Sequence, residues 1–339
     1  MPQRLDLALI QRRFDDAFGA APVTRSTALH VLTRSELRAA VRSGVIVSER
    51  HGVVRLAGDH GVESDARGGT SYTEIRRRAL AALATVDDRC VISGPAASIL
   101  RGQPIPGASI PVITATRAGA VNFDGPDLRL RGSALPPHHR DIVDGVPVTS
   151  LERTAIDVAR GQLLPSALLV LDAAARQIVA RESSARGEAL RYIVLDPRFI
   201  ESSIGRLERT LRELFGWPGT VAVREALPLV RPSSESPAES ISRGWFLEAS
   251  LGHLGPGTPV IVGSRTYWAD FCDERRRIIG EVDGWAKYGN DADSIRAALT
   301  SERSRQRALE SDDWRLVRWT ITEGRAAVVS RMSRALGRM

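Results

Sequence analysis

Acidic residues recur at a chemically useful spacing in the C-terminal third of the sequence. Asp270 lies in one apolar segment, and Glu281 and Asp283 lie in the next, with a charged turn over 273–276 between them. A hairpin centred in this turn places Asp270 opposite Glu281 on one face of two neighbouring strands. Asp283 is two residues beyond Glu281, so it shares that face. We expect the three carboxylates to converge on one patch.

Clustered carboxylates repel one another, and a bound cation relieves the repulsion. Mg²⁺, or Mn²⁺ in its place, is the hard, oxygen-liganded ion that suits such a patch. A metal held there activates water and stabilises charge on a phosphodiester oxygen. We therefore predict Asp270, Glu281 and Asp283 as metal ligands, with Asp283 as a third ligand or as the group that orients the water.

Nearly all basic residues are arginine: of the 47 arginines and lysines, 46 are arginine, and Lys287 is the single lysine. Arginine has too high a pKa to act readily as a base, whereas the pKa of a lysine falls when the side chain is desolvated. Lys287 follows Asp283 by four residues. We predict that Lys287 assists the attacking water.

The elements that must position these residues begin at Ser236. Ser236, Pro237 and Glu239 form a helix start with the pattern of a capping box, and the helix runs to about 251, burying Ile241, Leu247 and either Trp245 or Phe246. Strand and helix signals then alternate to the end of the chain. The predicted order is αβββαβ and a closing helix, with strands at 259–262, 267–271, 277–283 and 315–320 and helices at 293–309 and 324–336.

This framework with Asp270, Glu281 and Lys287 resembles the PD-(D/E)XK nuclease superfamily. The segments A-D-F and I-G-E-V-D-G-x-x-K, followed by a helix and W-R-L-V-R-W, are similar to very-short-patch-repair-like endonuclease domains. The resemblance implies a metal-dependent endodeoxyribonuclease with a restriction-endonuclease-like core, in which Glu239 is an accessory site residue. The sequence departs from the family pattern where Asp283 stands at the lysine position and the basic group is displaced to Lys287.

The first 60 residues have the pattern of a winged helix-turn-helix. Apolar residues recur at helical spacing over 5–18, Thr24 is a plausible N-cap, and Thr33 or Ser35 caps a second helix. Two short apolar runs then form a hairpin over 45–56. Nuclease domains of the kind named above are often preceded by a winged helix similar to the N-terminal domain of AbiEi-type antitoxins.

Arginines gather on the predicted second helix. Arg34, Arg38 and Arg42 recur every four residues and therefore lie on one helix face. In a winged helix-turn-helix this helix enters the major groove of DNA. We predict DNA contacts from these three arginines and from Arg25; the alternative is that they form an ordinary solvated face.

The segment 61–230 carries no catalytic constellation. After a linker at 61–70, helix and strand signals alternate in a way that predicts an α/β middle domain with a helical connector. His138 and His139 follow two prolines and are interpreted as an ordinary polar loop. The predicted boundaries are 1–60, 61–230 and 231–339. The expected elements are helices at 72–83, 94–100, 165–178, 201–215 and 218–227, a helix capped by Ser150, and strands at 90–93, 111–114, 128–130 and within 141–149.

Composition narrows the class of protein. The 339 residues, 43% of them hydrophobic, suffice for two or three folded domains of mixed α/β (α+β) type. No run of 18 apolar residues and no signal peptide is found, which predicts a cytoplasmic protein with no membrane partner. Cys90 and Cys272 form neither a zinc pattern nor a disulfide framework. The net charge of +7 is only weak evidence for DNA as a binding partner.

Two functions therefore compete, with a homodimer as a possible assembly for either. The first is a DNA-binding endonuclease that uses Mg²⁺ or Mn²⁺. The second is a DNA-binding transcriptional regulator, antitoxin-like or a phage-type repressor, whose nuclease fold is inactive. The intact carboxylates favour the enzyme, whereas the displaced lysine and the winged helix favour the regulator. A protein-interaction scaffold in a defence system is a third class.

Overall fold

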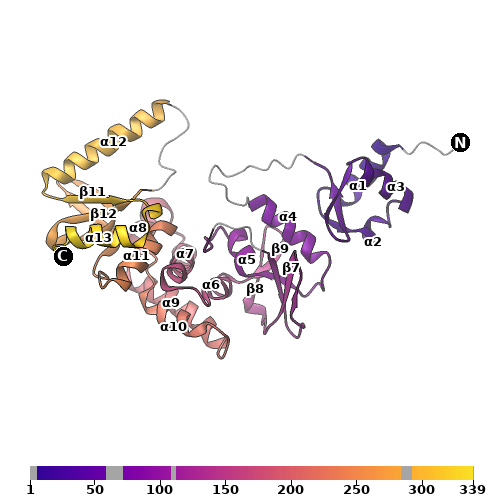
Figure 1. Ribbon diagram of the computed structural model, residues 1–339, viewed down its shortest axis with the longest axis horizontal. Coiled ribbons are helices and arrows are strands. Elements are labelled where there is room, and N and C mark those ends of the chain that lie inside the picture. The colour runs from indigo at the N-terminus through magenta and orange to yellow at the C-terminus, as the bar shows by residue number, and fades with distance from the viewer. Residues whose placement is uncertain (1–5, 59–71, 108–111, 284–291, 339) are drawn as a thin grey trace. The chain divides into compact units, whose positions relative to one another are not determined.

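The computed structural model describes residues 6–58, 72–107, 112–283 and 292–338, without the side chains of 292–299 and 301. The chain divides into two compact units, Met1–Asp157 (unit 1) and Val158–Met339 (unit 2), which are considered separately. The predicted boundaries at 60/61 and 230/231 stay predictions. In the described part of the chain, no helix has the length and apolar character needed to cross a membrane. Figure 1 shows a mixed arrangement of helices and strands in both units, as predicted.

The start of unit 1 is a winged helix-turn-helix. Three helices and a three-stranded sheet of order β1-β3-β2 enclose an apolar core that includes Ile10, Phe14 and Leu37. The prediction of this fold is confirmed by the element order (Figure 1), which is α1 (Leu7–Phe18), β1 (Val23–Thr24), α2 (Arg25–Ala28), α3 (Arg34–Arg42), β2 (Ile46–Arg50) and β3 (Val53–Leu56).

Side-chain caps fix where the helices of this fold begin. Thr24 Oγ1 accepts a hydrogen bond from the backbone N–H of Thr27 at 3.0 Å, as predicted for an N-cap. Of the two candidates for α3, Thr33 is the cap: its Oγ1 accepts from the Glu36 N–H at 3.3 Å, and Glu36 Oε2 accepts from the Thr33 N–H at 2.6 Å. This reciprocal pair is a complete capping box.

The second part of unit 1 is a six-stranded mixed sheet of order β6-β7-β5-β4-β9-β8, with α4 and α5 packed on it. The predicted helices are found, while the two-residue strand β6 was not predicted. The elements are α4 (Tyr72–Leu83), β4 (Val91–Ser93), α5 (Gly94–Leu100), β5 (Ile113–Arg117), β6 (Phe123–Asp124), β7 (Leu128–Gly132), β8 (Arg140–Val143), β9 (Val146–Thr149) and α6 (Leu151–Ala159).

A buried arginine joins α6 to the segment that follows β7. The guanidinium of Arg153, at the start of α6, donates to Asp157 Oδ2 at 2.9 Å, to the carbonyl of Ala134 at 3.0 Å and to Ser133 Oγ at 2.9 Å. The side chains of Arg153 and Asp157 are 1% and 7% exposed. A buried charge is tolerated only when it is paired and hydrogen-bonded, so these bonds stabilise the placement of α6.

Unit 2 begins with helices. The longest, α7, packs against α11, where the backbone of Gly244 lies so close to Pro165 that a Cβ atom would come within 2.4 Å of it. The short helix α8 was not predicted; it is seven residues long and has no buried residue. The elements are α7 (Leu164–Ser183), α8 (Gly187–Ile193), α9 (Pro197–Glu213), α10 (Thr220–Ala226) and α11 (Pro237–Glu248).

A four-stranded sheet of order β10-β11-β12-β13 completes unit 2. The first three strands are antiparallel neighbours, and β12 and β13 run parallel. The C-terminal end of α12 packs on one face through Leu309, and α11 and α13 cover the other (Figure 1). The predicted αβββαβ order with a closing helix is confirmed by β10 (Gly255–Val262), β11 (Arg265–Asp273), β12 (Ile278–Val282), α12 (Ala292–Ser311), β13 (Arg315–Trp319) and α13 (Gly324–Ala335).

The buried face of α11 differs from the expected one. Phe246 is buried as predicted, but Ile241, Trp245 and Leu247 are only half-buried. The other buried positions are polar or small, among them Ser242 and Arg243. The reason is that α11 lies between α7 and the sheet, so two of its sides are covered.

Candidate nucleic-acid interface and carboxylate centre

The hairpin that carries the predicted carboxylates has the predicted register. Phe271 pairs with Gly280 and Cys272 with Ile279, and the same register places Asp270 opposite Glu281. A 3₁₀ turn over Glu274–Arg276 joins the two strands, as the charged turn suggested. The turn position in the sequence was therefore enough to set the pairing of this hairpin.

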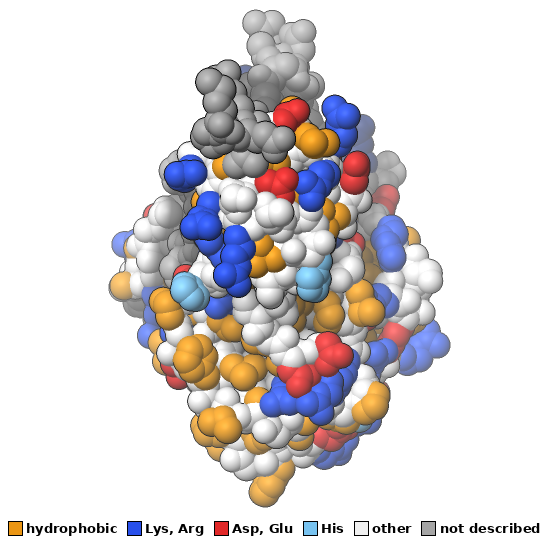
Figure 2. All heavy atoms as spheres, turned by 90° about the vertical axis from the view of Figure 1, so that its right-hand side faces the viewer, with side chains coloured by type: hydrophobic (Ala, Val, Ile, Leu, Met, Phe, Trp, Pro, Cys, Tyr) orange, Lys and Arg blue, Asp and Glu red, His pale blue; other side chains and the backbone are white. Residues whose placement is uncertain are grey.

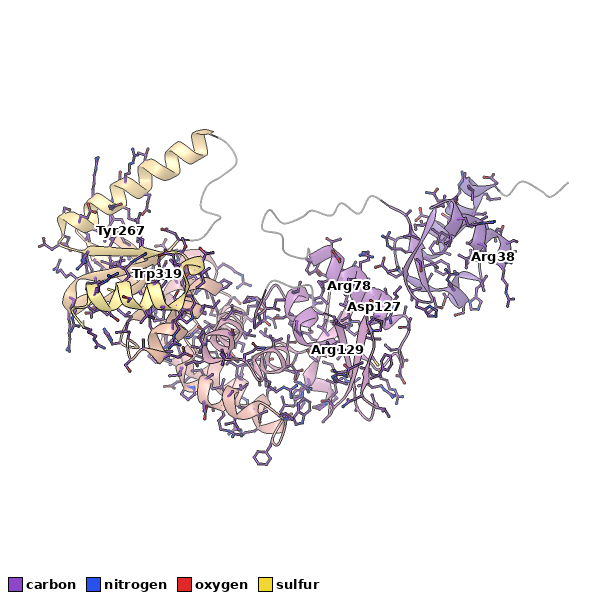
Figure 3. All side chains as sticks on the ribbon, in the orientation of Figure 1. Arg38, Arg78, Asp127, Arg129, Tyr267 and Trp319 are labelled. Atoms are coloured by element: carbon purple, nitrogen blue, oxygen red, sulfur yellow. The ribbon has the colours of Figure 1, made fainter. Side chains whose placement is uncertain are left out.

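A glycine lets the sheet close against its helices at this point. A Cβ atom at Gly280 would come within 2.8 Å of the Trp319 ring and 2.9 Å of Met332. The Trp319 indole extends from β13 toward α11, where its Nε1 donates to Ser242 Oγ at 3.0 Å (Figure 3). This close packing holds β12 and β13 in place below the carboxylates.

Asp270 and Glu239 form one half of the carboxylate centre. Asp270 Oδ2 accepts a hydrogen bond from the backbone N–H of Val282 at 2.7 Å, so the side chain reaches the neighbouring strand. Glu239 is buried, and burial together with the negative charge of Asp270 raises its pKa to about 7. The two carboxyl groups are thus electrostatically linked.

Glu239 also takes part in the start of α11. Ser236 Oγ accepts from the Glu239 N–H at 3.2 Å, which confirms Ser236 as the N-cap. The Glu239 carboxylate accepts from the Glu235 N–H at 2.7 Å, one residue earlier than a standard capping box requires. Glu239 is therefore a helix-start residue that also faces Asp270.

Glu281 lies in the other half of the centre, among arginines. It is the register partner of Arg318 on β13, whose Nε donates to Glu281 Oε2 at 2.8 Å. On the opposite side Arg305 of α12 pairs with Glu281 Oε1. Both arginines also contact Glu302, Arg305 at 3.4 Å and Arg318 more closely. We call Glu281, Glu302, Arg305 and Arg318 the arginine–glutamate network.

The carboxylates of the arginine–glutamate network change the pKa of Arg318. Burial lowers the pKa of Arg318, but the carboxylates of Glu281 and Glu302 outweigh burial and raise this pKa above its ordinary value. The negative charge of Asp283 adds to the rise. Asp283 is half-buried at the end of β12. The guanidinium of Arg318 is therefore surrounded by negative charge.

The described carboxylates do not fit a metal ion as they stand. Among the described residues of unit 2, no three acidic, histidine or cysteine side chains bring their ligand atoms within 4.8 Å of one another. Both oxygens of Glu281 lie in ion pairs with guanidinium groups; Oε2 accepts a hydrogen bond from Arg318, whereas the buried Oε1 has no hydrogen-bond partner among the described residues. Lys287 lies outside the described residues. The roles of Asp270, Glu281, Asp283 and Glu239 in catalysis, and the Mg²⁺ or Mn²⁺ site, stay predictions.

Sequence reasoning missed the arginines that surround Glu281. Arg318 alternates with Val317 and Trp319 along β13, and the structure places its guanidinium on the site. On α12, Arg303 and Arg307 are exposed, whereas Arg305 is half-buried. Its Nη2 also donates to the carbonyl of Trp268 at 3.1 Å.

The arginines predicted to contact DNA are all exposed. Arg34, Arg38 and Arg42 lie on α3, and Arg25 begins α2. Within the part of the chain that the structure describes, no carboxylate lies within 4.0 Å of these four. Figure 3 shows Arg38 projecting outward from α3, and Figure 2 shows basic side chains exposed at this end of the chain.

Other arginines of the winged helix are paired instead. Arg13 lies 2.8 Å from Glu36, and Arg55 lies 2.9 Å from Glu49. The structure therefore separates arginines that pair with carboxylates of the fold from the exposed arginines of α2 and α3, which have no carboxylate partner among the described residues. The span of α3 from Arg34 to Arg42 is about 12 Å at the helical rise per residue, which fits within a major groove.

One family model matches the chain. Residues 103–197 match the AbiEi antitoxin C-terminal domain, over less than a third of the sequence. The match lies in the segment where sequence reasoning found no function, while the resemblance to AbiEi-type proteins had been noted at the N-terminal winged helix. It does not reach the part that resembles a nuclease. A search of the curated proteins found no match.

Proposed function

We propose that the chain is a DNA-binding regulator of the antitoxin-like kind, which contacts DNA through α3 of its winged helix. The observation that carries the proposal is the row of three exposed arginines, without a carboxylate partner among the described residues, on one face of a capped helix. A winged helix-turn-helix places this helix in the major groove. The match of residues 103–197 to an AbiEi antitoxin domain supports the same class.

The contacts of the carboxylate centre favour the regulator over a metal-dependent nuclease. A metal ligand must offer its oxygen atoms to the ion, but both oxygens of Glu281 lie in ion pairs with arginines, and Oε2 also accepts a hydrogen bond from Arg318. Asp270 directs one oxygen to a backbone N–H. The observation that favours a nuclease is the buried Glu239, whose carboxyl group is electrostatically linked to the half-buried Asp270, and the nuclease remains the second candidate.

The test of DNA binding is a titration of labelled random-sequence duplex DNA, followed by fluorescence anisotropy at several salt concentrations. The variant Arg34→Ala/Arg38→Ala/Arg42→Ala is compared with Arg265→Ala/Arg303→Ala/Arg307→Ala, which removes three exposed arginines from unit 2. Each lost phosphate contact lowers the slope of log K against log salt by about 0.9, so three contacts lower it by up to about 2.7. We expect this loss in the α3 variant alone.

Two results would contradict the proposal. If the α3 variant binds like the wild type and the unit 2 variant does not, the DNA interface lies in unit 2. If supercoiled plasmid is cut in Mg²⁺ or Mn²⁺, and the cutting is absent in EDTA and in Asp270→Ala, the protein is a nuclease; the rate of Lys287→Ala then shows whether that lysine acts in the chemistry. Selection of bound fragments from a random DNA pool gives the recognised sequence in either case.

A further inference from the structure

The arginine–glutamate network balances its own charge. Two guanidinium groups and two carboxylates meet where β12, β13 and α12 come together, and each arginine contacts both glutamates. The Glu281 side chain is 5% exposed, whereas those of Arg305 and Arg318 are 21% and 33% exposed. The buried carboxylate is thus covered by cations that belong to the chain itself.

We infer that Arg305 and Arg318 are built-in cations, which neutralise the carboxylates of Glu281 and Glu302 in place of a divalent metal ion. Their planar guanidinium groups offer several donors in a fixed fork, so one group can bridge two carboxylates. Arg318 is fixed by strand register opposite Glu281, and Arg305 is anchored by its bond to the Trp268 carbonyl. Both positions follow from the fold.

This arrangement has a consequence for metal binding. A divalent ion at Glu281 would sit beside two positive charges, which repel it and compete for the same oxygens. Removal of both arginines leaves a buried carboxylate without its partners, and such a group must gain a proton or another cation. The inference concerns unit 2 alone and does not depend on DNA binding through α3.

The test is isothermal titration of the full chain with MnCl₂, together with thermal melting with and without the metal. We expect no saturable binding to the wild type and no change in its melting temperature. Arg305→Gln/Arg318→Gln should melt at a lower temperature, bind Mn²⁺ saturably, and be stabilised by it. Arg303→Gln/Arg307→Gln, which removes two exposed arginines of the same helix, should match the wild type.

The site of any binding is assigned with Glu281→Gln. Mn²⁺ binding to the wild type that is lost in Glu281→Gln would overturn the inference, and this measurement needs no folded arginine variant. Mn²⁺ binding gained by the double variant but retained after Glu281→Gln is added would also overturn it. The variant Glu302→Gln leaves both arginines on Glu281 and should gain no metal binding.

Discussion

Replacement of Arg243 by methionine should destabilise unit 2 more than any surface change in it. Arg243 of α11 donates to both oxygens of Asp172 on α7, at 2.7 and 2.6 Å, and also to the carbonyl of Leu229. The side chains of Arg243 and Asp172 are 6% and 0% exposed. The ion pair therefore ties α7 to α11 in a region that water does not reach.

The expected loss follows from what remains after the change. Asp172 still accepts a hydrogen bond from the backbone N–H of Arg231, at 2.8 Å, but it no longer has a guanidinium partner from α11. Loss of one partner of a buried ion pair costs about 3–5 kcal/mol, because the other charge stays buried and uncompensated. At a urea dependence of about 2 kcal/mol per M, a loss of about 4 kcal/mol lowers the unfolding midpoint by about 2 M.

Tryptophan fluorescence is a suitable assay for this variant, since it reports on one unit. All six tryptophans lie between positions 217 and 319, so unit 1 contributes none. Urea unfolding followed by this signal measures the stability of unit 2 without interference from the rest of the chain. The midpoint and the slope should both be recorded, because a changed slope would mean that the unfolding is no longer a single transition.

An exposed ion pair supplies the control. Arg325 lies 3.2 Å from Glu248 with its side chain 55% exposed, so Arg325→Met should cost at most about 1 kcal/mol. The double variant Arg243→Met/Asp172→Leu removes both buried charges and should lose less stability than Arg243→Met alone. If Arg243→Met unfolds at the same midpoint as Arg325→Met, the buried pair does not stabilise unit 2 and the reasoning is wrong.

Three further changes test other parts of the structure. Glu239→Gln should flatten the pH dependence of the stability of unit 2. The pKa of Glu239 is raised from 4.5 to about 7, so the protonated carboxyl group stabilises the folded state; this contribution is full below pH 4.5 and is lost as the pH rises through 7. Urea unfolding midpoints measured across this pH range test the prediction. Arg153→Met should speed the labelling of Cys90 by a thiol reagent in a Cys272→Ser background by about two to four powers of ten, from a loss of about 3–5 kcal/mol; an unchanged rate would refute a stabilising role. Thr33→Ala should lower the stability of the winged helix by about 0.5–2 kcal/mol, seen as a lower melting temperature by circular dichroism, and no shift would mean that the cap is dispensable.

The parts of the fold that sequence reasoning found are those fixed by local patterns. The order of elements after Ser236 follows from alternating apolar runs, and the β11–β12 register follows from one charged turn. Thr33 and Ser236 cap their helices because a side-chain oxygen there satisfies a backbone N–H a few residues away. Each of these features depends on residues that are close in sequence.

The partners of the candidate site depend on distant residues and could not be found in the same way. Glu281 meets Arg318 across 37 positions, and Arg243 meets Asp172 across 71. A single sequence shows that these residues are charged, but not which of them the packing brings together. The buried polar face of α11 was missed for the same reason, since it exists only because α7 covers it.

The division of arginines into paired and unpaired groups says more about function than the net charge does. The +7 of the whole chain fits DNA binding only weakly. In the structure, however, arginines such as Arg153, Arg243 and Arg305 each bridge acceptors from separate segments, which a lysine, as a point charge, would do less well. These arginines bind acceptors within the fold, so their charge is not available to DNA. What remains available to a polyanion is the subset whose guanidinium groups face solvent without a carboxylate, and on α3 that subset lies along one helix face.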